Sequence, residues 1–431
     1  MHRRIRALAV VVASAVLVLA AACSSGGGST TADGAGGGAA ASTSHYSAIP
    51  AGNIVLCGSY PISGQNAAFG STAGETAKID QTFINDLGGI AGHHVTVTVQ
   101  NDQSSATVGV NIAEQYASEH AQNQDQCPVV YQLSQDPATA PLQAAILSKA
   151  KIVILASQSP DQFFNSSQYP YFFSVSPPDK ALGDAAAHFL IEKKMTKVAV
   201  LTDNIPQELE YISDLEASAK ADGTALDIVK TATIPPGATN AQAALSTLRS
   251  ANPDVVLVAT EYGFGPIWSS FHTLGWSPNI MGDVGFFYDG YNALGNLASH
   301  AWAPCWQGEN VGQSLPSQVV SMINQIAPLN GGIAPDPIIA ASVSMEQMLL
   351  AKYAIEKYDS LDPAALQKAL QGMDNTKLLN WVGMQFTESS TFHGGLVGPY
   401  GAGICQSSPL GKVGDKNFPV FIYADNYRSG I

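Results

Sequence analysis

Hydroxyl, amide and carboxyl side chains recur directly after the short apolar segments of this sequence. In the first half of the chain these residues are Ser63, Gln65, Ser134, Gln135, Asp136, Ser157, Gln158 and Ser159, and further on they are Asn204, Glu261, Tyr262 and Asp283. Such groups suit hydrogen bonding to a small polar solute. Hydroxyls beside helix N-termini bind a carboxylate without a formal positive charge, and Asp136, Glu261 or Asp283 could pair with an ammonium group. Taken singly, each residue has a plainer explanation, because Ser and Asp after a strand commonly cap the next helix.

No motif of a common enzyme class accompanies these residues. The sequence lacks G-x-S-x-G, H-E-x-x-H and G-x-x-x-x-G-K-[ST]. His93 and His94 are most simply an exposed pair, and His272 and His393 have no acid or cysteine at the spacing of a metal site. We therefore expect no cofactor and no metal, and we favour binding over catalysis.

The apolar segments that carry the polar residues are predicted strands of a repeating β/α pattern. A strand from residue 54, a helix reaching residue 86, a glycine corner over 88–92 and a strand over 95–99 form one βαβ unit. Helices over 105–121 and 138–149 then alternate with strands over 129–133, 152–156 and 171–175. A second series has helices over 180–193, 209–222, 239–251 and 266–274 and strands over 197–201, 226–229, 254–259 and 279–283. Two such series predict an α/β protein with two open parallel sheets, whose strand ends hold the polar residues.

The composition fits two acidic globular domains. Hydrophobic residues make up 46% of the 431 residues and charged residues 13%, which is enough for two cores. The formal net charge of −14 and the lack of a basic stripe argue against nucleic acid as a partner. Beyond the N-terminus, no apolar run reaches the roughly 18 residues that a membrane span requires.

The N-terminal segment predicts export. Three arginines within residues 1–6 precede an apolar run over 7–22, so residues 1–22 are the expected signal peptide. The run ends at Ala20-Ala21-Ala22-Cys23, which resembles a lipobox, and Cys23 is the expected lipidation site. A plain A-x-A cleavage site is the alternative. Residues 23–50 consist mostly of Gly, Ala, Ser and Thr and are expected to be a flexible tether.

The first βαβ unit resembles that of leucine/isoleucine/valine-type solute-binding proteins of bacterial ABC importers. The Pro61-Ile62-Ser63-Gly64 turn, the Gly88-Gly89-Ile90-Ala91-Gly92 corner and the strand ending at Asp102 occur in the order of that family. The resemblance covers roughly residues 53–400. It implies a two-lobed periplasmic-binding-protein type I fold, two open parallel sheets flanked by helices, with three crossovers that we place near 176, 303 and 381. The first lobe would comprise 51–176 with 304–381, and the second 177–303 with 382–431.

The resemblance also implies a function. It places ligand contacts at Ser134 to Asp136 and at Ser157 to Ser159, although Asp283 is displaced by about one position and Glu261 stands where relatives have an aromatic residue. The expected protein is a lipid-anchored, extracytoplasmic, monomeric binding protein. It would capture a branched-chain or other amino acid, or an amide, and present it to ABC permease subunits. A sensor on the same fold with a protein partner, and more remotely a secreted hydrolase, are the alternatives.

Four cysteines remain besides Cys23. They are Cys57, Cys127, Cys305 and Cys405, and none forms a C-x-x-C pair, so an exported chain favours disulfides. Cys305 with Cys405 is the preferred pair because both fall in the irregular C-terminal part. A bond between Cys57 and Cys127 is doubtful, because parallel neighbouring strands would hold the two residues at different heights.

Overall fold

The computed structural model describes residues 49, 52–64, 66–70, 73–261, 263–287, 291–305, 316–330, 336–379, 385–397, 401–413 and 416–425. All of them belong to the compact unit Tyr46–Ile431. The predicted signal peptide, Cys23 and almost all of the predicted tether lie outside the described residues, as do Gln65 and Tyr262. None of the helices in the described ranges is both long and apolar enough to cross a bilayer.

The first sheet is parallel throughout. Its spatial order is β2-β1-β3-β4-β5, formed by β1 (Ile54–Tyr60), β2 (Val95–Asn101), β3 (Gln126–Gln132), β4 (Val153–Ala156) and β5 (Phe172–Ser174). Helices α1 (Ala67–Gly70), α2 (Ala73–Asp86), α3 (Ala106–Gln122) and α4 (Ala140–Lys149) and the 3-10 helix Asp161–Phe164 connect the strands. The predicted order of elements is confirmed for this part of the chain.

Apolar residues cover both faces of the first sheet. Along β3 and β4, Val129 and Val153 belong to one apolar cluster, whereas Val130 and Ile154 belong to the cluster on the other face. Successive side chains of a strand point to opposite faces, so a strand covered on both sides must be apolar at every position. This explains the continuous apolar runs of the sequence.

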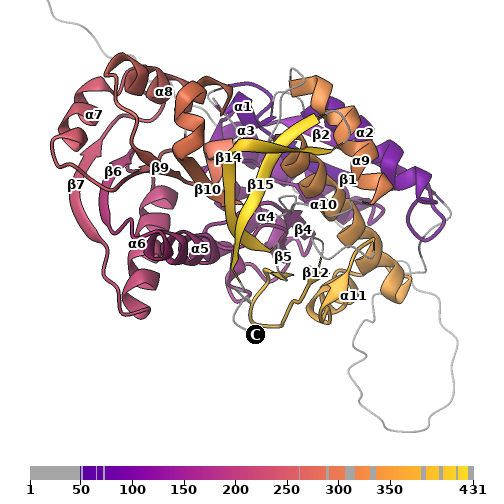
Figure 1. Ribbon diagram of the computed structural model, residues 1–431. Helices are drawn as coiled ribbons and strands as arrows, with labels where there is room; N and C mark the ends of the chain where they lie inside the picture. The colour runs from indigo at the N-terminus through magenta and orange to yellow at the C-terminus, as the bar shows by residue number, and fades with distance from the viewer. Residues whose placement is uncertain are drawn as a thin grey trace, which may run out of the picture. The chain divides into compact units, whose positions relative to one another are not determined.

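The second sheet combines parallel and antiparallel strands in the order β15-β14-β10-β9-β8-β6-β7. Its parallel strands are β6 (Lys197–Thr202), β7 (Asp227–Thr233), β8 (Val255–Ala259), β9 (Asn279–Gly282) and β10 (Ala301–Cys305). The antiparallel strands β14 (Ala402–Val413) and β15 (Lys416–Asp425), yellow in Figure 1, extend its edge. Helices α5 (Asp179–Glu192), α6 (Pro206–Ala221), α7 (Gln242–Arg249) and α8 (Phe264–Thr273) accompany this sheet, followed by the 3-10 helices Val284–Phe287 and Tyr291–His300.

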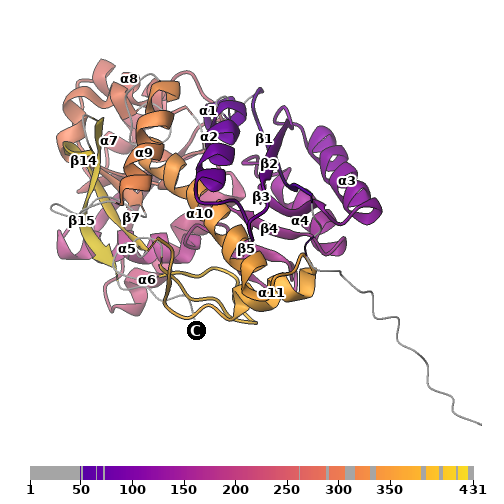
Figure 2. The ribbon, with the colours of Figure 1, turned by 90° about the vertical axis from the view of Figure 1, so that its right-hand side faces the viewer.

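The chain then returns to the first sheet. Helices α9 (Ser317–Ile326), α10 (Asp336–Tyr358) and α11 (Pro363–Gln371) follow β10, with the 3-10 helix Ala327–Asn330 after α9. Helix α10 packs against α2, β3 and β4, and Figure 2 shows α10 and α11 in orange beside the first sheet. The Lys352 ammonium donates a 2.6 Å hydrogen bond to the Gly89 carbonyl, which ties α10 to the glycine corner.

The predicted boundary near 381 lies too early in the chain. The short strands β11 (Thr376–Lys377), β12 (Gln385–Phe386) and β13 (Leu396–Val397) form a small sheet. Between β12 and β13, Phe392 forms a β-bridge with Asn165, and Gly394 forms one with Ser174. Both bridges connect this segment to residues of the first lobe. The described chain therefore stays with the first lobe until about residue 397 and joins the second sheet only at β14.

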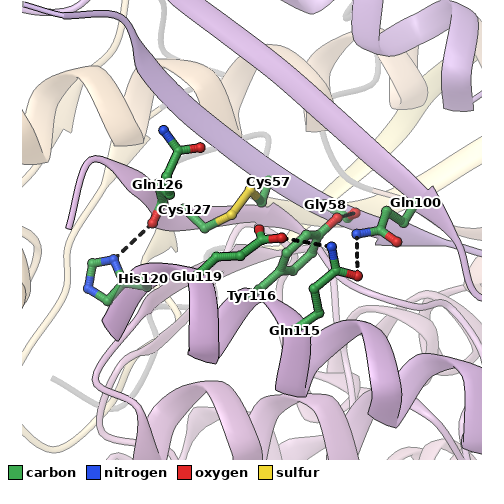
Figure 3. The surroundings of a disulfide bond; sticks show 9 residues. All are labelled: Cys57, Gly58, Gln100, Gln115, Tyr116, Glu119, His120, Gln126 and Cys127. Carbon is green, nitrogen blue, oxygen red and sulfur yellow. Dashed lines mark hydrogen bonds between the residues drawn. A yellow bond between two sulfur atoms is a disulfide. The ribbon is translucent and has the colours of Figure 1, made fainter. Parts of the chain in front are cut away.

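Two disulfides are present. Cys305 on β10 bonds to Cys405 on β14, as predicted, with 5.8 Å between their Cα atoms. Cys57 also bonds to Cys127, with 5.2 Å between Cα atoms, so our doubt about this pair was wrong (Figure 3). The cause is an irregular ladder: Val55 pairs with Gln126 but Cys57 already pairs with Val130, so β3 bulges between these points. Cys127 adopts a positive φ of 51° in the bulge, and this brings it level with Cys57.

Candidate functional site

The strand ends of both sheets meet at a cavity of about 710 Å³. Its walls come from the segments that follow β3, β4, β6 and β7. The lining residues are Asp136, Pro137, Ala138, Ala140, Gln158, Pro160, Gln162, Phe163, Ile205, Pro206, Gln207, Glu210 and Pro236. A crevice at the carboxyl ends of parallel strands is where open α/β folds bind small ligands. The cavity therefore lies at the predicted strand ends.

The lining is apolar with a few acidic and amide groups. Prolines, alanines, Phe163 and Ile205 supply the apolar surface, Gln158, Gln162 and Gln207 supply amides, and Asp136 and Glu210 supply carboxyl groups. Within the described part of the chain, no Lys, Arg or His lines the cavity. The site thus offers hydrogen-bond partners and negative charge, but no cationic side chain.

The turn after β3 is held by its own side chains. One oxygen of Asp136 accepts hydrogen bonds from the backbone N–H groups of Ala138 and Thr139 and from the Thr139 hydroxyl, at 3.1, 2.9 and 2.7 Å. The other oxygen accepts a 3.0 Å bond from the Asn66 amide. Ser134 is buried, and its hydroxyl accepts the N–H of Asp136 at 3.2 Å. Asp136 therefore faces the cavity with a carboxylate that already secures the start of α4.

The turn after β4 is likewise bonded within the protein. The Gln135 amide donates to the Ser157 carbonyl at 3.1 Å, which connects the two turns, and the Ser157 hydroxyl bonds to that of Ser176. The Ser159 carbonyl accepts the N–H of Asp179 at 2.8 Å. In this turn only Gln158 both belongs to the predicted set and lines the cavity.

Ser63 lies away from the cavity lining. Ser63 is exposed, and its hydroxyl accepts a 2.9 Å hydrogen bond from the side-chain NH2 of Asn101. Its backbone N–H donates to the side-chain oxygen Oδ1 of Asn101 at 3.2 Å. This pair fixes the turn after β1 to the end of β2. Gln65, predicted beside it, lies outside the described residues.

The predicted second-lobe residues lie beside the cavity lining and not in it. Asn204 is exposed with a positive φ of 62°, and the residues directly after it, Ile205 to Gln207, line the cavity instead. Asp283 is 3% exposed and accepts the backbone N–H groups of Thr260 and Phe286 at 3.1 and 3.0 Å. Glu261 is partly exposed, and its backbone N–H donates to Asp203 at 3.0 Å.

These acids form a group whose members oppose each other's ionisation. Burial, and then the charges of Asp283 and Asp203, raise the pKa of Glu261 to about 8. Burial also raises the pKa of Asp283 to about 7, although backbone N–H groups and a side-chain hydrogen bond with Glu208 oppose the shift. Among the described residues, no group of three or more His, Cys, Asp or Glu is arranged to hold a metal ion.

Several residues that line the cavity were not predicted from the sequence. Gln207 and Glu210 were overlooked because we predicted the helix to begin at residue 209, whereas α6 begins at Pro206. A proline at the first helical position after a strand was the available signal. Phe163 is 1% exposed and stacks on Phe172, and it also forms part of the cavity wall.

Comparison with known proteins identifies the family and the fold of the chain. A sequence model of the family described as periplasmic binding protein matches residues 54–394. A periplasmic binding protein type 1 from Bordetella pertussis Tohama I is similar in structure, with a TM-score of 0.69 and 16% identity over 86% of this chain and 100% of that chain. A branched chain amino acid ABC transporter protein from Thermus thermophilus with bound valine has a TM-score of 0.67 and 16% identity, over 88% and 98% of the two chains.

A solute binding protein of an ABC transporter from R. palustris, in complex with benzoate, also has a TM-score of 0.67, with 15% identity over 88% of this chain and 98% of that chain. At these identities the likeness establishes the fold. No curated protein matches the chain.

Proposed function

The chain belongs to the periplasmic binding protein family, and on this premise we propose that it captures a small polar solute outside the cytoplasm for an ABC importer. The observation that carries the proposal is the cavity of about 710 Å³ at the strand ends of both sheets. A cavity of this size holds a small organic molecule. The amide and carboxyl groups between its apolar walls can form hydrogen bonds with a polar ligand. The structural relatives bound to valine and to benzoate point to the same size class of ligand.

The solute would stabilise a closed arrangement of the two lobes. The cavity takes its walls from both lobes, through Asp136 and Gln158 on one side and Gln207 and Glu210 on the other. A ligand that contacts both sides favours the conformation in which they are close. The chain passes between the lobes after β5, after β10 and before β14, and these passages would serve as hinges. A permease subunit would recognise the closed form.

A ligand screen by thermal unfolding tests the binding function. Purified protein, verified as folded and freed of ligand, is heated with amino acids, amides, ureas, small carboxylates and amines. A ligand at 100 times its Kd adds about 2.7 kcal/mol to the free energy of unfolding, so a binding solute raises the Tm. Ala138→Trp, which fills the cavity from an exposed lining position, should abolish the shift, whereas Ala364→Trp, exposed on α11, should keep it. If no solute of any class shifts the Tm, the capture function is wrong.

Binding without turnover is the second part of the proposal. A binding protein returns its solute unchanged, and the expected result of prolonged incubation is the intact compound by mass spectrometry. A product formed at a rate that Ala138→Trp suppresses would instead establish a hydrolase.

We further propose that lipid chains on Cys23 hold the protein at the outer face of the membrane. The Gly-, Ala-, Ser- and Thr-rich residues after the anchor would let the folded unit reach a permease. Cys23→Ala should move the protein from the membrane fraction to the medium or the soluble extracytoplasmic fraction. Continued membrane association of the variant would contradict lipid anchoring.

A further inference from the structure

More carboxyl groups lie beside the cavity than are bound by backbone N–H groups of the protein. On the second-lobe side, Asp203 and Asp283 are bound by backbone N–H groups, but Glu208 and Glu261 are additional. Glu208 is 3% exposed and shares a side-chain hydrogen bond with Asp283, and its Oε2 is buried without a hydrogen-bond partner. Such an oxygen has lost its hydration without compensation, which is costly for a carboxyl group.

A second acidic group adjoins the cavity at Glu210. Burial, and then the charges of Asp161 and Asp214, raise the pKa of Glu210 to about 7. Asp179, at the start of α5, is 2% exposed, and its Oδ2 is buried without a hydrogen-bond partner. Lys180, next in sequence to Asp179, has its ammonium 3.6 Å from the Asp184 carboxylate on the same helix. The two groups adjoin one another, since the charges of Glu210 and Glu261 both act on Asp179.

The helix N-termini at the cavity are already used by the protein's own acids. Asp136 accepts three hydrogen bonds at the start of α4. At the start of α6, Pro206 has no N–H to donate, the N–H of Ile205 donates to Asp203 at 3.2 Å, and Glu208 occupies the first turn. A ligand carboxylate entering this cavity would meet acids and no free cation among the lining residues. It would be repelled.

We propose that the solute is an organic amine or guanidine with a net positive charge and no carboxylate, held by Glu210 in the cavity lining, with Glu208 and Glu261 adding negative charge beside the lining. The inference rests on the proposed capture function and names its substrate class. Positive groups would supply the counter-charge that the described cavity lacks. Gln158, Gln162 and Gln207 offer carbonyl oxygens to N–H donors, and the proline and alanine surface fits a methylene chain.

Isothermal titration calorimetry at pH 8 distinguishes the solute classes. The probes are 1,5-diaminopentane and agmatine as cations, L-leucine as a zwitterion and L-glutamate as an anion. We expect both cations to bind at least tenfold more tightly than leucine, and glutamate to show no binding. Glu210→Gln and Glu261→Gln keep the side-chain shape but remove the charge, and each should weaken cation binding at least tenfold. The control Glu192→Gln, on an exposed side chain beside Lys193, should leave the Kd unchanged.

Each contrary result has a defined meaning. If leucine binds and the cations do not, capture of a solute stands and the cationic class is overturned. If no probe binds to protein shown to be folded, the cationic class is overturned, and the wider screen decides separately on capture. Equal weakening by all three variants would also overturn the assignment, because the effect would then be one of general charge and not of the cavity.

Discussion

The Gln158 side-chain amide donates a 2.9 Å hydrogen bond to the backbone carbonyl of Ser134. Both residues stand in turns that the sequence marked as ligand-binding, and here they bind each other across the ends of β3 and β4. Gln135 makes a second connection, to the Ser157 carbonyl. The two turns therefore form a preorganised rim, and ordering them costs little when a solute arrives.

Removing the Gln158 amide should destabilise the fold. Gln158→Ala leaves the buried carbonyl of Ser134 without this donor, and we expect a loss of about 1–3 kcal/mol in the free energy of unfolding. Urea titration followed by circular dichroism measures it. Gln162→Ala is the matched control, because Gln162 is exposed and also lines the cavity. An equal loss in both variants would contradict a special role for the Gln158 bond.

Both disulfides should contribute to stability. They close segments of 70 and 100 residues, and crosslinks of this kind restrict the unfolded chain, typically by about 2–4 kcal/mol. We expect the double variants Cys57→Ser with Cys127→Ser, and Cys305→Ser with Cys405→Ser, each to lower the urea midpoint. Titration of free thiols in the unfolded wild-type protein should detect none of these four residues. Four reactive thiols there would mean that the pairs are not bonded in the exported protein.

Much of the fold could be predicted because local patterns of apolar and polar residues indicate strands and helices. The runs that became β3, β4, β6 and β8 are continuous and apolar, and an α-helix directly follows β3, β6 and β8. The bond between Cys57 and Cys127 could not be predicted in this way. It depends on a bulge in the ladder between β1 and β3, and the register between two strands is a tertiary property.

The sequence indicated the edge of the sheet at which the cavity lies, but among the described residues only two of those predicted to bind a ligand line it. Strand ends lie where ligands bind, so Asp136 and Gln158 were found at the cavity. Ser134 and Asp283 were indistinguishable from them in sequence, but their side chains are buried and bonded to nearby backbone. Whether a polar residue caps a helix or faces a ligand depends on a side-chain direction that a single sequence does not encode.

The ligand-free protein should lose stability as the pH rises from 6.5 to 8.5. In the unfolded chain Asp and Glu are ionised throughout this range. In the fold, the raised pKa values of Glu210 and Asp283, about 7, and of Glu261, about 8, retain protons. The folded state thus binds more protons, and raising the pH favours unfolding. His393, whose pKa burial lowers to about 4, has the opposite effect, but only below its unfolded value near 6.5.

Thermal unfolding in buffers of equal ionic strength measures this trend, and we expect the Tm to fall by a few degrees. Glu261→Gln should flatten the curve, because the amide has no proton to lose. A Tm that rises over this range would mean that these carboxyl groups are already ionised and stabilised in the ligand-free fold.

Cation binding should respond to pH in the opposite direction. Alkyl amines stay protonated up to about pH 10, so between pH 6 and 8.5 only the protein changes its charge. Glu210, Asp283 and Glu261 become anionic over this range, and anionic carboxylates attract an ammonium that neutral ones do not. We expect the Kd for 1,5-diaminopentane to decrease at least tenfold from pH 6 to pH 8.5. Glu210→Gln should reduce this dependence, whereas Glu192→Gln should preserve it. A Kd that is constant or increases with pH would show that these carboxyl groups do not hold the cation.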